Sequence, residues 1–243
     1  GTGLGEAVAF LGRLGVRAAP VVTAVAVRGP GGRRRIEPTA RALVEEQALT
    51  ALDALGPAVK AVAVDFVTDG GAGAWLAQEA HARRLPLVVG PVGHLAGGGA
   101  GAARLAAQLP LVKAATLLSV DADEAALLSG EIWNGTRDGT LHLARALAGP
   151  ARTAGVLATG LPGEFCSAAI AGPAGELIVD APCAARGPFR GTASATLAAA
   201  AGYLALGLPP LEAASAACRL VGAALAGAAG LEGVPLSPEP WSV

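Results

Sequence analysis

The sequence predicts an α/β fold: a doubly wound, mostly parallel sheet flanked by helices. Three observations favour this fold class. Short apolar runs alternate with helical patterns along most of the 243 residues. The runs, such as 59–67, are apolar on both faces, as buried parallel strands require. Glycine and proline separate the segments, and an alternation of strand and helix produces a parallel sheet covered on both sides.

In the first part of the chain, a helix is expected over 3–15, because Leu4, Val8, Leu11 and Leu14 recur at helical spacing before Gly15. A second helix is expected over 38–54, with Pro38 in its first turn, where a missing N–H costs nothing. The other elements expected here are a strand over 19–27, a strand over 59–67, a helix from Asp69 to about Arg84 and a strand over 85–89.

The second part continues the alternation and adds a hairpin. Residues 165–171 and 176–180 are expected to pair through the turn Gly172-Pro173-Ala174-Gly175. The other expected elements are strands over 115–120 and 155–158 and helices over 102–109, 121–128, 139–148, 192–206 and 210–226. With 230–243 as a polar tail, residues 1–243 are expected to form one domain.

Composition and net charge limit the kinds of core, partner and compartment that are expected for this chain. Hydrophobic residues make up 53% of the chain but aromatic residues only 3%, so a core of small side chains is expected. The net charge of −1 gives no reason to expect a nucleic-acid partner. No run of about 18 apolar residues lacks glycine, proline or charge, so no membrane span is expected. The three dispersed cysteines favour a reducing cytoplasm over a disulfide framework or zinc site.

The segment Gly191-Thr192-Ala193-Ser194 is the most informative candidate site. It opens directly into an Ala-rich helix, and the unpaired N–H groups at such a helix start attract anions, above all phosphate. Ligands of doubly wound sheets bind at the carboxyl ends of the strands. We therefore expect this turn to share one face with the loops after residues 27, 67, 89, 120 and 158.

The order of several short motifs resembles the hydroxymethylpyrimidine and hydroxymethylpyrimidine-phosphate kinases of thiamine biosynthesis, within the ribokinase-like superfamily. The matching segments are the Gly-rich opening 1–5, Ile36-Glu37-Pro38, Pro91-Val92, Asp121 to Glu124, Gly191 to Ser194 and the start of the last helix at 208–214. They span nearly the whole chain. In this resemblance, the first strand of the family would precede Gly1.

The resemblance implies a ribokinase-like fold and transfer of the ATP γ-phosphate, with Mg²⁺, to a small-molecule substrate; a homodimer is left open. It also implies roles for individual residues. These are Ser194 at the position of the catalytic base, Arg190, Gly191, Thr192 and Ala193 for phosphate, Gly3 and Glu37 for the pyrimidine substrate, and Asp121 and Glu124 for a magnesium-bound water.

The departures from the family pattern lie mainly at the positions that the resemblance assigns to the active site. Ser194 stands where the family has cysteine and the wider superfamily a catalytic aspartate, and an unassisted serine hydroxyl is too weak a base near neutral pH. The other departures are Ala193 for glycine, Gly90 for aspartate, Asp121 for asparagine, Arg190 for histidine, Ala158-Thr159-Gly160 for Lys-Gly-Gly, and Ala63 and Asp65 for lysine and glycine.

Three functions therefore remain open: an active kinase, a non-catalytic relative that binds a nucleotide or pyrimidine phosphate, and a dinucleotide-dependent oxidoreductase. The candidate residues also have simple structural alternatives. Ser194 could satisfy an N–H at the helix start, and Asp121 with Glu124 could form an acidic first turn that complements the helix dipole. Glu37 could be a plain carboxylate before a helix, and Arg190 a surface cation.

Overall fold

The computed structural model describes residues 3–28, 34–90, 99–148, 155–159, 167–181 and 192–228. Its elements, in chain order, are α1 (Leu4–Arg13), β1 (Ala24–Arg28), β2 (Arg34–Pro38), α2 (Arg41–Leu55), the short 3₁₀ turn η2 (Gly56–Ala58), β3 (Val62–Val64), α3 (Gly70–Ala82), β4 (Leu87–Val89), α4 (Gly99–Ala114), β5 (Leu117–Asp121), α5 (Ala122–Ser129), α6 (Arg137–Ala148), β6 (Gly155–Thr159), β7 (Ala168–Gly172), β8 (Gly175–Val179), α7 (Thr192–Ala205) and α8 (Pro210–Ala228).

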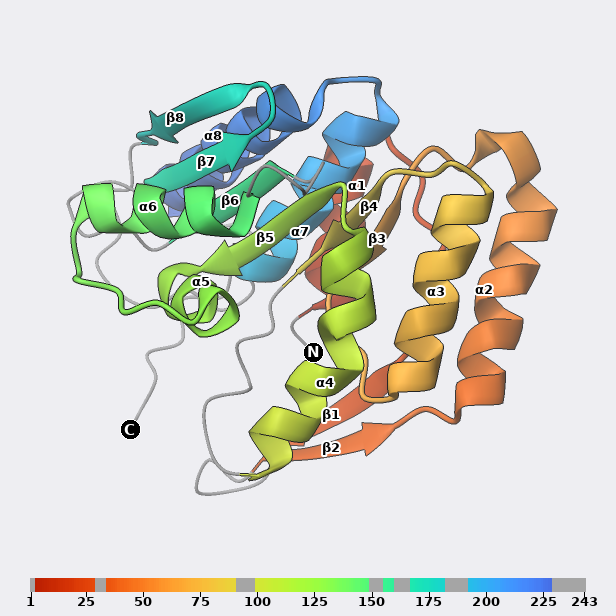
Figure 1. Cartoon of the computed structure of the whole chain (residues 1–243). Coiled ribbons are helices and arrows are strands. Elements are labelled where there is room, and N and C mark those ends of the chain that lie inside the picture. The colour runs from red at the N-terminus through yellow and green to blue at the C-terminus, as the bar shows by residue number, and fades with distance from the viewer. Residues whose placement is uncertain are drawn as a thin grey trace.

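The main sheet confirms the predicted fold class. Its strand order is β3-β4-β5-β6-β7-β8, and the first four strands are parallel. The last two run antiparallel, and β7 pairs with β8 from Ala168↔Val179 to Gly172↔Gly175, which is the hairpin expected near 165–180. Helices cover both faces: α1, α7 and α8 lie behind the sheet and α2 to α6 in front of it (Figure 1).

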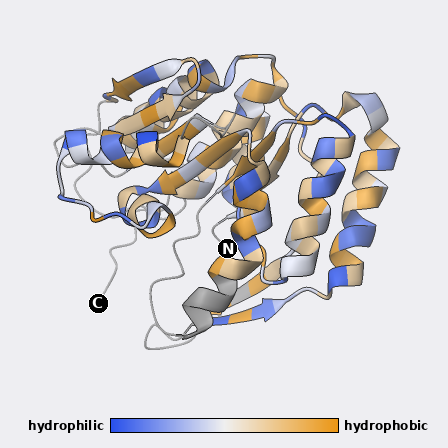
Figure 2. Cartoon of the chain, viewed as in Figure 1, coloured by the Kyte–Doolittle hydropathy of each residue, from blue (hydrophilic) through white to orange (hydrophobic). Residues whose placement is uncertain are grey.

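The strands alternate between the two covering layers. In β6, Val156 and Ala158 pack into the core below α2 to α6, while Leu157 packs into the core with α1, α7 and α8. In β4, Leu87 and Val89 face the first core and Val88 the second. Because both faces of the central strands are buried, β4 and β6 are mostly apolar, and the colouring in Figure 2 shows the contrast with the more polar outer helices.

Small residues let α7 lie deep in the molecule. Its residues 194–202 are all buried, and α7 contacts β3, β4 and β5 as well as α1 and α8. A Cβ on Gly202 would lie 2.7 Å from a methyl carbon of Leu14 and 3.0 Å from one of Leu11, both in or next to α1. The low aromatic content predicted a core of this kind, and it places the start of α7 directly at the strand ends.

Two expectations for the first part of the chain were wrong. Residues 34–38 form β2, which pairs with β1 in a separate antiparallel sheet, so Pro38 ends a strand and α2 begins only at Arg41. The loop after residue 27 consequently belongs to this hairpin and not to the main sheet. The Thr23 hydroxyl donates to the carbonyl of Phe66 at 2.6 Å, which anchors the hairpin beside the loop that follows β3.

Helix ends follow the sequence signals more closely. Asp69 caps α3 by accepting the N–H of Ala72 at 2.7 Å, and Asp121 caps α5, which stops at Gly130 in the left-handed conformation. The helix expected over 102–109 is longer, because α4 continues past Pro110. In the part of the chain described by the structure, no helix has the length and apolarity needed to cross a bilayer. The expected tail 230–243 lies outside the described residues.

Candidate active site

The centre of the candidate site is a hydrogen bond between two residues 129 positions apart in the sequence. The Ser194 hydroxyl, in the first turn of α7, donates to Asp65 Oδ2 at 2.7 Å. Asp65 directly follows β3, which is shorter than the predicted strand over 59–67 and leaves residues 65–67 as a loop. Ser194 is only 8% exposed. The hydroxyl expected at the helix start thus holds a partly buried carboxylate at the carboxyl end of the sheet.

Gly3 also lies at this point, and its predicted role in binding the substrate stays a prediction. It caps α1 with a φ of +105°, a conformation that side chains rarely adopt. A Cβ built on Gly3 would lie 3.5 Å from Asp65 Oδ2. Glu6, in the first turn of α1, brings a second carboxylate, and its Oε2 is buried without a hydrogen-bond partner among the described residues. The start of α1 and the start of α7 therefore meet at Asp65.

Negative charge accumulates here. Burial raises the pKa of Asp65, and the charge of Glu6 raises it further, while the hydrogen bond from Ser194 acts in the opposite direction. Burial raises the pKa of Glu124 to about 8, with further contributions from the charges of Asp121 and Asp65. Carboxylates in mutual repulsion favour protons or cations in their midst. The site is therefore arranged to accept a proton or a metal ion more readily than an unaccompanied anion.

Asp121 and Glu124 form a reciprocal capping box, so their structural alternative is correct. Asp121 Oδ1 accepts the N–H of Glu124 at 2.7 Å, and Glu124 Oε2 accepts the N–H of Asp121 at 2.9 Å. Glu124 is 5% exposed, and its Oε1 is buried without a hydrogen-bond partner among the described residues. This orphaned oxygen is the atom that fits a magnesium-bound water, and the metal role of the pair stays a prediction.

A metal ion here would need further ligands. Within the described ranges, no cluster of three or more histidine, cysteine or acidic side chains is arranged to hold a metal. Mg²⁺ usually keeps several waters and binds through one or two carboxylates together with the phosphates of its substrate. The pair Asp121 and Glu124 fits that incomplete kind of site.

The structure describes only part of the segment predicted to bind phosphate. Thr192 and Ala193 lie in the first turn of α7, whereas Arg190 and Gly191 lie outside the described residues. Ala193 is exposed, so the methyl group that replaces a family glycine lies toward solvent. The first N–H groups of α7 have no acceptor within the helix itself. Anion binding at this helix start stays a prediction.

Glu37 is placed differently from its expected position before a helix. It lies on β2, opposite Val25 of β1, and its exposed side chain pairs with Arg35 on the same strand. The structure therefore puts Glu37 on the outer hairpin and not in direct company with Ser194. Its substrate role stays a prediction.

At Gly90, a side chain from α7 fills the space beside the strand end. Gly90 follows β4, and its N–H donates to the carbonyl of Val64 at 2.8 Å. A Cβ on Gly90 would collide with Cδ1 of Leu197 and lie 3.1 Å from its Cγ. Leu197 comes from α7 and is 2% exposed. The space beside the strand end, where the family pattern has an aspartate, is filled by this leucine.

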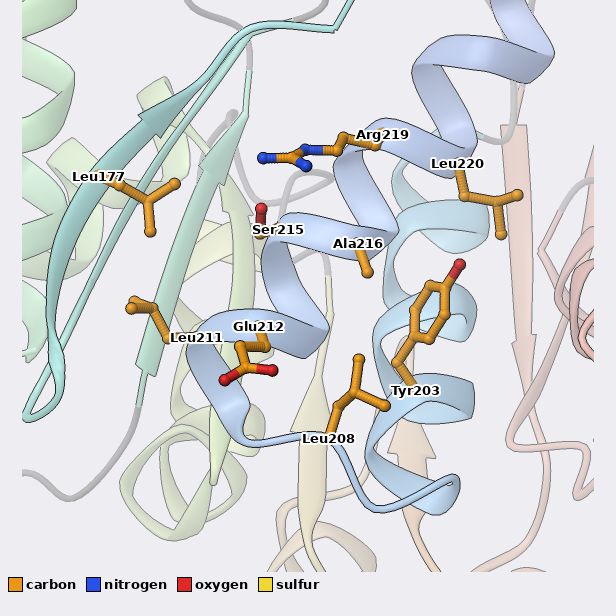
Figure 3. A pocket seen from close by; sticks show the side chains of 9 residues that line it. All are labelled: Leu177, Tyr203, Leu208, Leu211, Glu212, Ser215, Ala216, Arg219 and Leu220. Carbon is orange, nitrogen blue, oxygen red and sulfur yellow. The ribbon is translucent and has the colours of Figure 1, made fainter.

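A groove on the described part of the chain lies elsewhere. It has a volume of about 710 Å³ and is lined by α8 together with Leu177, Tyr203 and Leu208, with Glu212 and Arg219 among its polar residues (Figure 3). Tyr203 is in the last turn of α7, at the opposite end of that helix from Ser194. The groove is therefore separate from the candidate site.

Sequence reasoning missed two members of the site. Asp65 was noticed only as a departure from a family glycine, and Glu6 was not singled out. Burial and the Ser194 contact identify Asp65 once the structure is known. A signal was present in the sequence, because a carboxylate directly after a buried apolar strand is expected at the ligand-binding edge of the sheet.

Comparison with known proteins agrees with the resemblance in the sequence. The family model for phosphomethylpyrimidine kinase matches residues 1–235. No curated protein sequence matches the chain significantly.

Solved structures support the fold. A pyridoxal kinase from Bacillus subtilis, in an ADP complex, superposes with a TM-score of 0.80 at 19% identity, over 93% of this chain and 86% of its own. A pyridoxal kinase from Staphylococcus aureus, with AMP-PCP and pyridoxal, gives 0.77 at 20% identity, over 93% and 83%. A phosphomethylpyrimidine kinase from Clostridium difficile gives 0.71 at 17% identity, over 91% and 93%.

Proposed function

The chain belongs to the phosphomethylpyrimidine kinase family, and from this premise we propose that it transfers the γ-phosphoryl group of ATP to hydroxymethylpyrimidine or to its phosphate. The observation that carries the proposal is the meeting of the α7 start with the strand end at Asp65, through the Ser194 hydroxyl. Phosphoryl transfer depends mainly on positioning and on neutralising charge. A helix start at the carboxyl end of a parallel sheet supplies both.

The first turn of α7 has the role of receiving phosphate oxygens in this reaction. The N–H groups at a helix start point along the helix axis and are fixed before the substrate arrives, so they need no reorganisation during the transfer. The negative charges of Asp65 and Glu6 would repel a bare polyphosphate. The nucleotide is therefore expected to arrive with a divalent cation, and its affinity should depend on that cation.

Glu124, through its unpartnered Oε1, and Asp121 are the residues that would hold Mg²⁺ by way of bound water. When bound, Mg²⁺ would neutralise the negative charge on the transferring phosphates. The same two residues keep the first turn of α5 in place through their capping box. The capping box therefore holds both carboxyl groups at the end of β5.

The test is a coupled assay of ADP release with purified protein, ATP and Mg²⁺. Hydroxymethylpyrimidine, its phosphate and pyridoxal are offered separately, since two of the similar structures are named as pyridoxal kinases. We expect substrate-dependent ADP release with a pyrimidine and a phosphorylated product identified by mass. Absence of turnover above background with every substrate, at high enzyme concentration, would contradict the proposal.

A second candidate is a protein of this family that binds the same ligands without turnover. The packing of Leu197 against Gly90 favours it, because the leucine occupies the space where the family pattern has an aspartate. Calorimetry with ATP-Mg²⁺ and with the pyrimidine phosphate separates the two candidates. Binding without ADP release supports the second one.

A further inference from the structure

The proposed reaction needs a group that takes the proton of the acceptor hydroxyl, and Ser194 alone does not supply one. A positioned base contributes roughly 10²- to 10⁴-fold to such a step. Among the residues that the structure describes, the Ser194 hydroxyl donates to the carboxylate of Asp65. We propose that Asp65 is the proton acceptor of this site and acts through the Ser194 hydroxyl. This inference rests on the proposed function.

The geometry of the pair suits a relay. Ser194 Oγ and Asp65 Oδ2 are 2.7 Å apart, the separation of a good hydrogen bond to a carboxylate. Ser194 is almost fully buried and belongs to the first turn of α7, which faces the strand ends. A serine that donates its proton to a carboxylate keeps its oxygen lone pairs available. The Ser194 oxygen can therefore accept a second hydrogen bond from a substrate hydroxyl.

The step balances as a concerted transfer. The acceptor hydroxyl gives its proton to Ser194 Oγ while the Ser194 proton passes to Asp65 Oδ2. The acceptor oxygen forms its bond to the γ-phosphorus, the bond from that phosphorus to the β,γ-bridging oxygen breaks, and ADP leaves with the electron pair. Asp65 ends neutral, Ser194 is unchanged, and the proton on Asp65 returns to solvent afterwards.

The surroundings of Asp65 raise its basicity. The charge of Glu6 acts on it from α1, and the Ser194 hydroxyl donates to it from α7, while the charge of Asp65 in turn raises the pKa of Glu124 on α5. Burial and the charge of Glu6 hold the pKa of Asp65 above its ordinary value of 3.8. A base whose pKa lies closer to the working pH takes a proton more effectively in the transition state. The acidic neighbour Glu6 thus serves the relay by making Asp65 a stronger base.

The competing explanation is that the hydrogen bond only fastens α7 to the loop after β3. Asp65→Asn separates the two explanations, because an asparagine carbonyl still accepts the Ser194 hydroxyl but does not take up its proton. In the relay, kcat falls about 10²- to 10⁴-fold while the KM for ATP changes little. If the bond is merely a fastener, kcat stays within a few-fold of wild type.

The pH profile gives a readout that a structural role does not move. In the wild-type protein, kcat/KM should rise with pH as Asp65 loses its proton, and this acidic limb should vanish in Asp65→Asn. Ser194→Ala should lose a similar factor in kcat, and the double variant should lose no more than either single variant, because both belong to one relay. Asp53→Asn is the matched control, since Asp53 is an exposed carboxylate on α2 that pairs with Arg83.

A relocation experiment covers the case in which Asp65→Asn folds poorly. In Asp65→Gly combined with Ser194→Asp, the carboxylate moves onto α7 and the residue after β3 becomes glycine. Recovery of at least tenfold over Asp65→Gly alone supports the relay, and no recovery overturns it. If the wild type is active, and Asp65→Asn keeps that activity together with the acidic limb of the pH profile, this inference is overturned while the proposed function stands. A wild type inactive with every substrate overturns the proposed function and the relay together.

Discussion

The packing of Leu197 against Gly90 predicts an energetic coupling that unfolding experiments can measure. Gly90→Ala places a methyl group where Leu197 Cδ1 now lies, with Cγ only 3.1 Å away. Both residues are buried, so the leucine has to leave its present rotamer, and overpacking of this kind costs about 1–3 kcal/mol. Leu197→Ala removes the obstacle but opens a cavity, at a cost of about 2–5 kcal/mol.

The double variant carries the prediction. If the two changes were independent, their costs would add to about 3–8 kcal/mol. Because the methyl of Gly90→Ala projects into the space that Leu197→Ala vacates, we expect the double variant to cost no more than Leu197→Ala alone. The coupling free energy would then be about 1–3 kcal/mol in the favourable direction.

The assay is urea unfolding at equilibrium, followed by circular dichroism, for the wild type, both single variants and the double variant. Gly12→Ala is the control for a new methyl group, since a Cβ on this α1 glycine meets no atom within 4 Å. Additivity of the two costs within about 0.5 kcal/mol would refute the reasoning. Leu197 would then not occupy the space beside Gly90 in solution.

Three further predictions concern other parts of the fold. The pKa of Glu124 in the folded state is raised from 4.5 to about 8, so the folded state binds a proton that the unfolded state releases. The free energy of unfolding should therefore fall as pH rises from about 5 to 8, by at most about 5 kcal/mol. Glu124→Gln should flatten this pH dependence in thermal melts, and an unchanged slope would contradict the prediction. Gly73→Ala should lower the urea midpoint, by about 1–3 kcal/mol in free energy, because its Cβ would lie 2.7 Å from a backbone carbonyl of α4, whereas Gly12→Ala should leave the midpoint unchanged or raise it. Thr23→Val removes the hydrogen bond to Phe66 and should speed hydrogen exchange in β1 and β2 more than in the main sheet; uniform exchange rates would count against a separately anchored hairpin.

The main sheet could be predicted from sequence because its strands leave little choice. Runs that are apolar on both faces fit only a doubly covered sheet, and the side-chain alternation seen at Val156, Leu157 and Ala158 confirms it. Helix starts at Asp69 and Asp121 were readable because a capping carboxylate acts on N–H groups a few residues away. Local interactions of this kind are fully contained in a short stretch of sequence.

The hairpin of β1 and β2 could not be predicted in the same way. Its second strand carries the exposed residues Arg35 and Glu37, and a strand exposed in this way has no apolar periodicity to reveal it. Pro38 then imitates a helix start, although it closes the strand. Only tertiary context decides between these alternatives, and here that context includes the bond from Thr23 to the carbonyl of Phe66.

The candidate site shows the same limit at the level of single residues. In the sequence, Ser194 in place of a base and Asp65 in place of a glycine look like two unrelated departures from the family pattern. In space they are one hydrogen-bonded pair, so a carboxylate absent from the start of α7 is present on the neighbouring strand end, 2.7 Å away from the serine. A count of missing family residues therefore overstates how far the chemistry has been dismantled. In the proposed relay, the group that the reaction needs is a basic oxygen at the helix start, and here the residue after β3 supplies it in place of α7.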